Sequence, residues 1–330
     1  MADDATMSGV KPENDAESLL QVRHLKKYFD TPRGKLHAVD DVSFEIRRGG
    51  TLGLVGESGC GKSTTGRALL RLTEPTDGEV LFEGQNILTL SLDEMRKKRR
   101  DLQIIFQDPF SSLDPRMSVA QIIAEPLTVN GVLRGRALSE KVQELMNVVG
   151  LSRRLTSAYP HELDGGRRQR VGIARALALT PKFIVCDEPV SALDVSIQAQ
   201  ILNLMKTIRK QMNLTYLFIT HDLSVVYHFS DEIAVMYLGR IIEKASSEEL
   251  FTNPLHPYTE ALLSAIPVPS LRDRRKRIIM KGEITSPIDP PAACRFAGRC
   301  PSVVEKCRSA EPELKEITPG HLVSCFLRDA

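Results

Sequence analysis

GESGCGKST, at residues 56–64, is the stretch of this sequence that decides the fold. It follows an apolar run at residues 52–55 and opens a helix-like stretch, the context in which G-x-x-x-x-G-K-S/T binds phosphate. Glycines let backbone N–H groups converge on a phosphate, and the helix N-terminus adds positive potential. We expect Lys62 to reach the β- and γ-phosphates and the Ser63 hydroxyl to bind Mg²⁺. The loop residues predicted at the nucleotide are Gly56, Ser58, Gly59, Cys60, Gly61, Lys62, Ser63 and Thr64.

Outward from this loop, short apolar runs alternate with helix-like stretches up to about residue 244, as in a parallel α/β sheet. Predicted strands include residues 52–55, 104–106, 183–186 and 217–220. Predicted helices include residues 62–72, 196–212 and 223–229. Helical patterning dominates residues 119–179, which predicts a helical insertion. We therefore expect a disordered tail at 1–18, an α/β domain at 19–252 with a helical subdomain at about 113–180, and a small irregular Cys-rich module at 253–330.

The composition of the 330 residues is that of a soluble globular protein, with 42% hydrophobic and 26% charged residues. The formal net charge of +2 gives no indication of a nucleic-acid partner. No apolar run approaches the roughly 20 residues needed to span a bilayer. The polar, mostly acidic N-terminus also lacks the apolar core of a signal peptide. We expect an intracellular protein; if it serves a membrane, other chains supply the span.

FIVCDEP, at residues 183–189, reads as an apolar strand that ends in two carboxylates. Asp187 suits the outer coordination sphere of Mg²⁺, and Glu188 is placed to polarise the water that attacks a phosphate. An exposed acidic turn is the competing interpretation. His221 ends another apolar strand, at the sheet edge where open α/β folds bind ligands, so we expect it to contact the γ-phosphate. A lone histidine is more often structural, and that alternative stays open here.

These segments, together with Gln107 in IFQDP and the segment at residues 163–170, occur in the order found in ABC-type ATPases. The chain resembles that family across roughly residues 19–244. The resemblance implies an ABC-type P-loop ATPase whose cofactors are ATP and Mg²⁺, with catalytic roles for Glu188, His221 and Gln107. It implies that Ser63, Gln107 and Asp187 serve the metal. An aromatic residue would stack on adenine; Phe29 fits best and Tyr28 second, with core packing as the competing role for both.

In that family two subunits sandwich two ATP molecules head to tail, so each site joins one subunit's phosphate loop with the other's signature segment. The residues that the resemblance assigns to the partner's nucleotide are Leu163, Asp164, Gly165, Gly166, Arg167, Ser191 and Asp194. Here the usual Leu-Ser-Gly-Gly-Gln reads LDGGR. An ionised Asp164 can only accept hydrogen bonds, whereas serine donates one to the γ-phosphate. We therefore predict an asymmetric pair, in which the site completed by Asp164 binds ATP but hydrolyses it slowly.

Three stretches resemble the ATPases of dipeptide and oligopeptide importers: residues 59–67, 106–116 and 253–267. The resemblance implies one of two paired ATPases at the cytoplasmic face of the cell (inner) membrane. Its implied partners are a second ATPase in a heterodimer, two membrane permeases and an extracytoplasmic binding protein. A soluble ABC ATPase that remodels ribosomes or DNA is the alternative from another class, although no long heptad run is present. An importer ATPase for nickel or another small solute is also compatible.

Four of the six cysteines crowd into the terminal module, with the spacing Cys294-x5-Cys300-x6-Cys307-x17-Cys325. In a chain without an export signal such a cluster favours metal or iron–sulfur ligation over disulfides. Members of the resembled family often hold a four-iron cluster at these positions. Zinc competes, since four thiolates also suit it, but the paired C-x₂-C knuckles of zinc ribbons are missing. Free buried thiols are the remaining possibility.

Overall fold

The computed structural model describes residues 18–108, 110–266, 278–280, 282 and 286–328. The tail predicted at 1–18 lies outside this range except for Ser18, which begins the first strand. In the described part of the chain the strands form two sheets. The smaller sheet is antiparallel, with the order β2-β1-β4-β5: β1 (Ser18–Thr31), β2 (Gly34–Arg47), β4 (Asp77–Phe82) and β5 (Gln85–Asn86). None of the strands predicted above falls in this sheet.

The larger sheet has the order β11-β12-β10-β9-β3-β8-β7-β6. Its parallel part comprises β3 (Thr51–Val55), β6 (Leu102–Ile105), β7 (Phe183–Asp187), β8 (Thr215–Thr220) and β9 (Glu232–Tyr237). β3, β7 and β8 are buried along their whole length, because helices and the smaller sheet cover their faces. The predicted strands fall on β3, β6, β7 and β8, except that β6 ends before Phe106.

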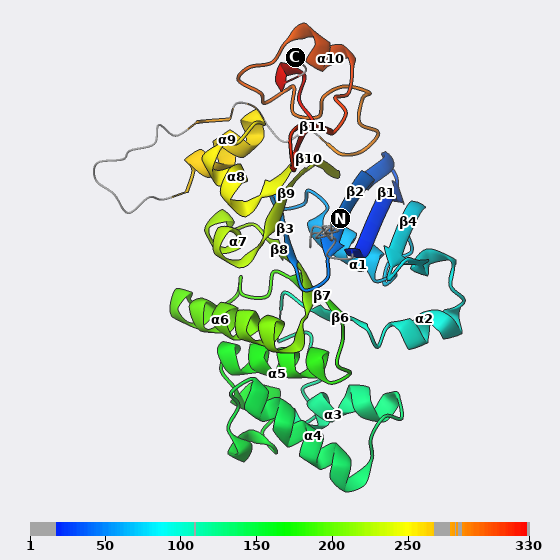
Figure 1. The fold of residues 1–330 in the computed structure, drawn as a ribbon, viewed down its shortest axis with the longest axis vertical. Helices are drawn as coiled ribbons and strands as arrows, with labels where there is room; N and C mark the ends of the chain where they lie inside the picture. The colour runs from blue at the N-terminus through cyan, green and yellow to red at the C-terminus, as the bar shows by residue number, and fades with distance from the viewer. Residues whose placement is uncertain (1–17, 109, 267–277, 281, 283–285, 329–330) are drawn as a thin grey trace, which may run out of the picture.

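Helices precede or follow these parallel strands. They are α1 (Lys62–Leu69), α2 (Leu92–Lys98), α6 (Val195–Met212) and α7 (Leu223–Phe229). α6 joins β7 to β8 and α7 joins β8 to β9, whereas α1 leads from β3 to β4 and α2 from β5 to β6. Between β6 and β7 the chain forms α3 (Val119–Val129), α4 (Gly135–Val148) and α5 (Gly165–Leu177), which lie together at one end of the molecule (Figure 1). They fall inside the segment where the sequence predicts a helical insertion. Ser118 begins α3 by accepting a hydrogen bond from the Gln121 N–H, and the Gln121 side chain accepts one from the Ser118 N–H.

The remaining elements are β10 (Arg240–Ser246), α8 (Ser247–Thr252), α9 (Pro257–Ser264), α10 (Glu305–Ser309), β11 (Lys315–Thr318) and β12 (His321–Val323). The sequence predicts an irregular terminal module, yet β12 pairs with β10 and so extends the main sheet. The buried carboxylate of Glu243 binds residues of the C-terminal region to β10. Glu243 accepts hydrogen bonds from the backbone N–H groups of Leu255 (2.6 Å) and His256 (3.0 Å), and lies 2.8 Å from Nε2 of His321.

The sequence contains two basic runs, at residues 96–100 and 272–277. The first lies at the end of α2, where cations suit the helix dipole, and the second lies outside the described residues. Among the helices that the structure describes, none has the length and apolar character needed to cross a membrane.

Candidate nucleotide site

The predicted phosphate loop joins β3 to α1, and two of its glycines are required by close backbone contacts. Gly56 and Gly61 have φ angles of 153° and 107°. A Cβ on Gly56 would lie 2.2 Å from the Met236 carbonyl oxygen, and one on Gly61 would lie 2.0 Å from that of Ala38. Any side chain at either position would therefore displace the loop.

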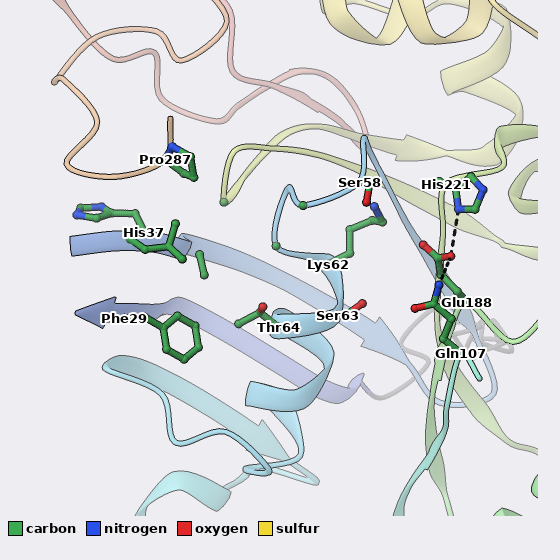
Figure 2. A pocket seen from close by; sticks show the side chains of 15 residues that line it. Phe29, His37, Ser58, Lys62, Ser63, Thr64, Gln107, Glu188, His221 and Pro287 are labelled. Atoms are coloured by element: carbon green, nitrogen blue, oxygen red, sulfur yellow. Dashed lines mark hydrogen bonds and ion pairs between the residues drawn. The ribbon is translucent and has the colours of Figure 1, made fainter. Parts of the chain in front are cut away.

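The loop forms one wall of a cavity of about 530 Å³ (Figure 2). Its other walls come from the antiparallel sheet, the ends of the parallel strands and the terminal module. The lining residues are Phe29, Leu36, His37, Ala38, Ser58, Gly59, Gly61, Lys62, Ser63, Thr64, Gln107, Glu188, His221, Gly239 and Pro287. Figure 2 shows Phe29, His37 and Pro287 at one end of the cavity and Gln107, Glu188 and His221 at the other. A long ligand with an aromatic end and a polyanionic end fits this layout.

Lys62 is 5% exposed, and its ammonium group donates to the carbonyl oxygens of Gly56 (2.8 Å) and Glu57 (3.0 Å). These bonds hold the ammonium group across the loop. Beside it, the Ser63 hydroxyl donates to Oδ1 of Asp187 at 2.6 Å. Burial raises the pKa of the Asp187 carboxyl group. A hydroxyl and a carboxylate held together at the edge of a phosphate loop are oxygen ligands of the type that Mg²⁺ prefers, so the residues present fit that ion.

Two side chains converge on the carboxylate of Glu188 at the far end of the cavity. Oε2 of Glu188 accepts a hydrogen bond from Nε2 of Gln107 at 3.1 Å and lies 3.1 Å from Nδ1 of His221 (Figure 2). Glu188 has φ 47°, a left-handed conformation that non-glycine residues seldom adopt, and its N–H donates to the Ile219 carbonyl oxygen. Strained backbone of this kind is common at functional sites, where the surrounding structure holds a side chain in a defined direction.

The two aromatic candidates lie in different surroundings. Phe29 lines the cavity and is 38% exposed. Tyr28 is not among the lining residues in the described part of the chain. Its ring stacks on His37 with centroids 4.0 Å apart, and its hydroxyl donates to Asp40. The geometry therefore favours Phe29 as the aromatic contact of a base and gives Tyr28 a packing role.

Three other predicted residues lie just behind the cavity wall. Cys60 is 4% exposed and packs in the core, where burial raises the pKa of its thiol. Gly56 and Asp187 also support the wall rather than line it, Asp187 through its bond to Ser63.

The signature segment lies at the start of α5, where Asp164 is the N-cap. Its Oδ1 accepts a hydrogen bond from the Arg167 N–H at 2.7 Å, and its Oδ2 lies 3.4 Å from Nε of Arg167. Among the described residues, the predicted partner-site set contributes nothing to the cavity of its own chain: Leu163, Asp164, Gly165, Gly166, Arg167, Ser191 and Asp194. Asp164 and Arg167 instead line a separate hollow at the start of α5.

This segment packs directly on the start of α6. A Cβ on Gly166 would lie 2.7 Å from Cγ2 of Ile197, and one on Gly165 would lie 3.1 Å from Cδ2 of Leu193. Asp194 caps α6 through the Ile197 N–H, and Ser191 Oγ donates to the Glu188 carbonyl oxygen at 3.2 Å. The structure thus connects the signature segment to the end of β7, where Glu188 lies, through residues 188–197.

Within the described residues, no three His, Cys, Asp or Glu side chains are arranged so that they could hold a metal ion. The iron–sulfur site predicted at Cys294, Cys300, Cys307 and Cys325 is therefore not formed in this structure and stays a prediction. None of these four cysteines is in a disulfide. Burial first, and then the charges of the other three thiolates, raise the pKa of Cys294 to about 11, so the other three lie within electrostatic reach of Cys294.

Sequence reasoning missed several lining residues: Leu36, His37, Ala38, Gly239 and Pro287. Pro287 comes from the terminal module, more than 200 positions beyond the phosphate loop. Its place on the cavity wall depends on a tertiary contact for which the sequence carries no local pattern.

The comparisons with known proteins agree with this geometry. Residues 39–191 match a family model described as ABC transporter, and residues 242–307 match one described as oligopeptide/dipeptide transporter, C-terminal region. The oligopeptide transport ATP-binding protein AppF of Bacillus subtilis (strain 168) is 52% identical, over 94% of this chain and 98% of AppF. The oligopeptide transport ATP-binding protein OppF of the same organism is 51% identical, over 94% of this chain and 96% of OppF.

Among solved structures, the ATP-binding cassette MJ0796, dimeric and bound to ADP and Pi, matches with a TM-score of 0.63 and 29% identity. The match covers 69% of this chain and 98% of that chain. Fold and site together define an ATP-binding cassette ATPase. Within that class, the chain belongs to the family of oligopeptide transport ATP-binding proteins.

Proposed function

We propose that this chain hydrolyses ATP to power the uptake of di- and oligopeptides through a membrane importer. The observation that carries the hydrolytic part is the convergence of Gln107 and His221 on Glu188, beside the Ser63–Asp187 pair. The peptide part rests on the family to which the chain belongs and on the match of its C-terminal region. That region argues against remodelling of ribosomes or DNA, and against nickel as the cargo.

The arrangement supports a division of labour along the cavity. Phe29 contacts the base, and Lys62 binds the β- and γ-phosphates together with the backbone N–H groups of the loop. Mg²⁺, held through Ser63 and Asp187 with Gln107 nearby, would neutralise phosphate charge. Glu188 polarises the attacking water, and His221 contacts the γ-phosphate. Phosphoryl transfer needs mainly positioning and charge stabilisation, which these residues supply.

The importer needs further chains. The partners we propose are a second ATPase that forms a heterodimer with this one, two membrane permeases and an extracytoplasmic binding protein. MJ0796 forms a dimer with ADP and Pi bound, which supports a paired arrangement. The chain would act at the cytoplasmic face of the inner membrane as a peripheral subunit.

The experiment that tests this function is uptake by a strain lacking the chain. We expect that strain to lose accumulation of labelled di- and oligopeptides and to regain it on expression of the wild-type chain, but not of the Glu188→Gln variant. Labelled nickel is measured in parallel. Loss of nickel uptake with intact peptide uptake would overturn the assignment of cargo, and loss of neither would overturn the transport function.

We also propose that the four clustered thiols hold a four-iron, four-sulfur cluster. Their donor chemistry and their freedom from disulfides fit such a group. When bound, it would staple a module with few apolar residues. Anaerobically purified protein should be brown and contain iron, and replacing the four cysteines with serine should abolish both. Colourless protein with stoichiometric zinc would support the zinc alternative instead.

A further inference from the structure

The turn between Cys294 and Cys300 inserts three side chains into the ATPase domain. Phe296 is 2% exposed and packs against Tyr237 and Tyr258, with ring centroids 5.3 and 5.4 Å away. Arg295 pairs with the Asp40 carboxylate and donates to the Leu238 carbonyl oxygen. Arg299, which directly precedes Cys300, extends to the phosphate loop. The C-terminal extension (residues 253–330) is therefore anchored at the nucleotide site.

Arg299 meets the loop through a two-point contact. Nη1 of Arg299 donates to Oε2 of Glu57 at 2.8 Å, and Nη2 donates to Oε1 at 3.0 Å. The Arg299 side chain is 9% exposed and that of Glu57 is 23% exposed, so the pair is largely shielded from water. Forked guanidinium–carboxylate pairs of this kind fix both distance and direction. Hydrogen bonding to Glu57 is the main reason that the pKa of Arg299 lies above its usual value.

The backbone of Glu57 is held as well. Its N–H donates to the Tyr258 hydroxyl at 3.0 Å, and its carbonyl oxygen accepts from the ammonium group of Lys62. Tyr258 belongs to α9 of the extension and is fully buried. Side chain and N–H of one loop residue are thus both bound by the extension, while its carbonyl is bound by the lysine expected to bind phosphate.

A second, separate segment of the extension reaches the opposite end of the cavity. Residues 286–289 run along β2, where the His37 N–H donates to the Pro287 carbonyl oxygen and the Asp289 N–H donates to that of Lys35, both at 2.9 Å. An isolated bridge pairs Leu36 with Ile288. Pro287 lines the cavity on the side of Phe29 and His37 (Figure 2).

We propose that the C-terminal extension is part of the nucleotide site, with Arg299 and Tyr258 as positioning residues that hold the phosphate loop through Glu57. Glu57 places a negative charge on the loop that has to receive a polyphosphate. Arg299 neutralises that charge and prevents the carboxylate from turning towards the phosphates. Without it, the loop carries an unpaired carboxylate, which repels ATP more strongly than a ligand with fewer phosphates.

The test compares ligands that differ in phosphate number. In the full chain, Arg299→Ala should weaken ATP binding roughly tenfold and AMP binding less than twofold, because the repulsion acts on the β- and γ-phosphates. In the assembled transporter KM for ATP should rise with kcat nearly unchanged, since the contact acts on binding before the chemical step. Arg308→Ala, an exposed arginine of the same extension, is the matched control and should leave both affinities unchanged.

If the Arg299–Glu57 pair only stabilised the fold, the binding measurements would give a different result. Arg299→Ala would then lower the midpoint of thermal unfolding but weaken ATP and AMP equally, or neither, and the proposal would fall. The double variant Glu57→Gln with Arg299→Ala removes the unpaired carboxylate and should recover at least half of the lost ATP affinity. If the Arg299→Ala variant does not fold, Arg299→Lys can be tested instead, because lysine keeps the positive charge but cannot form the two parallel hydrogen bonds to Glu57. It should lose ATP affinity about threefold, and an unchanged affinity would count against the positioning role.

Discussion

The end of the cavity around Glu188 and the signature segment belong to one chain, yet they match the residue types expected for the family to different degrees. At the cavity, Glu188 has both of its expected neighbours, Gln107 and His221. At the signature segment, Asp164 retains the position of the usual serine and caps α5, but it offers an acceptor where a donor is expected. The comparison teaches that a substitution can preserve local geometry while it reverses the chemistry offered to a ligand.

Replacing the carboxylate at the intact end should give the largest effect. Glu188→Gln should retain ATP binding but lower turnover roughly 100-fold or more, because the side chain acts on the attacking water rather than on the nucleotide. Nucleotide affinity and steady-state hydrolysis in the assembled transporter measure the two quantities. Normal turnover would contradict the assignment of Glu188, and the partner's own catalytic glutamate is silenced in a parallel sample so that its site contributes nothing.

The Lys62→Ala substitution changes the same cavity, but we expect it to affect ATP binding rather than turnover. The ammonium group should contribute charge-assisted hydrogen bonds to the phosphates, so its loss should weaken ATP binding roughly 10- to 100-fold. Equilibrium titration with ATP measures this in the isolated chain. Cys60→Ser, in the same loop but buried behind the cavity wall, is the control and should bind ATP within about threefold of the wild type. Equal affinity of the Lys62→Ala variant and the wild type would remove Lys62 from the binding role.

These residues were predictable because the pattern that positions them is local. The phosphate loop lies between strand β3 and helix α1. Asp187 ends the buried strand β7 and Glu188 follows it, so the apolar periodicity of the strand is enough to place both carboxylates. Arg299 and Pro287 were not predictable. Arg299 meets Glu57 across 242 positions of sequence, and only the packing of Phe296 and the pairing of residues 286–289 bring the extension there. No short motif encodes such a contact.

The signature segment can be tested by restoring the usual residues. Asp164→Ser with Arg167→Gln should raise hydrolysis at the partner's site severalfold, measured with this chain's own site silenced by Glu188→Gln. The reason is charge, since two like charges ~4 Å apart in water repel by about 1 kcal/mol, and more in a shielded interface. Arg167 lies 3.4 Å from the Asp164 carboxylate and offsets part of that repulsion. An unchanged rate in this background would end the asymmetry argument.

The smallest expected effect separates the cap from the charge. Asp164→Ala removes the side-chain acceptor of the Arg167 N–H and should lower the free energy of unfolding by about 1 kcal/mol, while Asp164→Ser should not change it. Ser118 caps α3 in the same helical region, so Ser118→Ala should lose a similar amount of stability. Only Asp164→Ala also removes a negative charge from the signature segment. It should therefore raise hydrolysis at the partner's site despite lower stability, whereas Ser118→Ala should leave that rate unchanged. If both variants lose stability and neither changes the rate, Asp164 acts at this position as a helix cap alone, and the difference between the two regions is not one of catalysis.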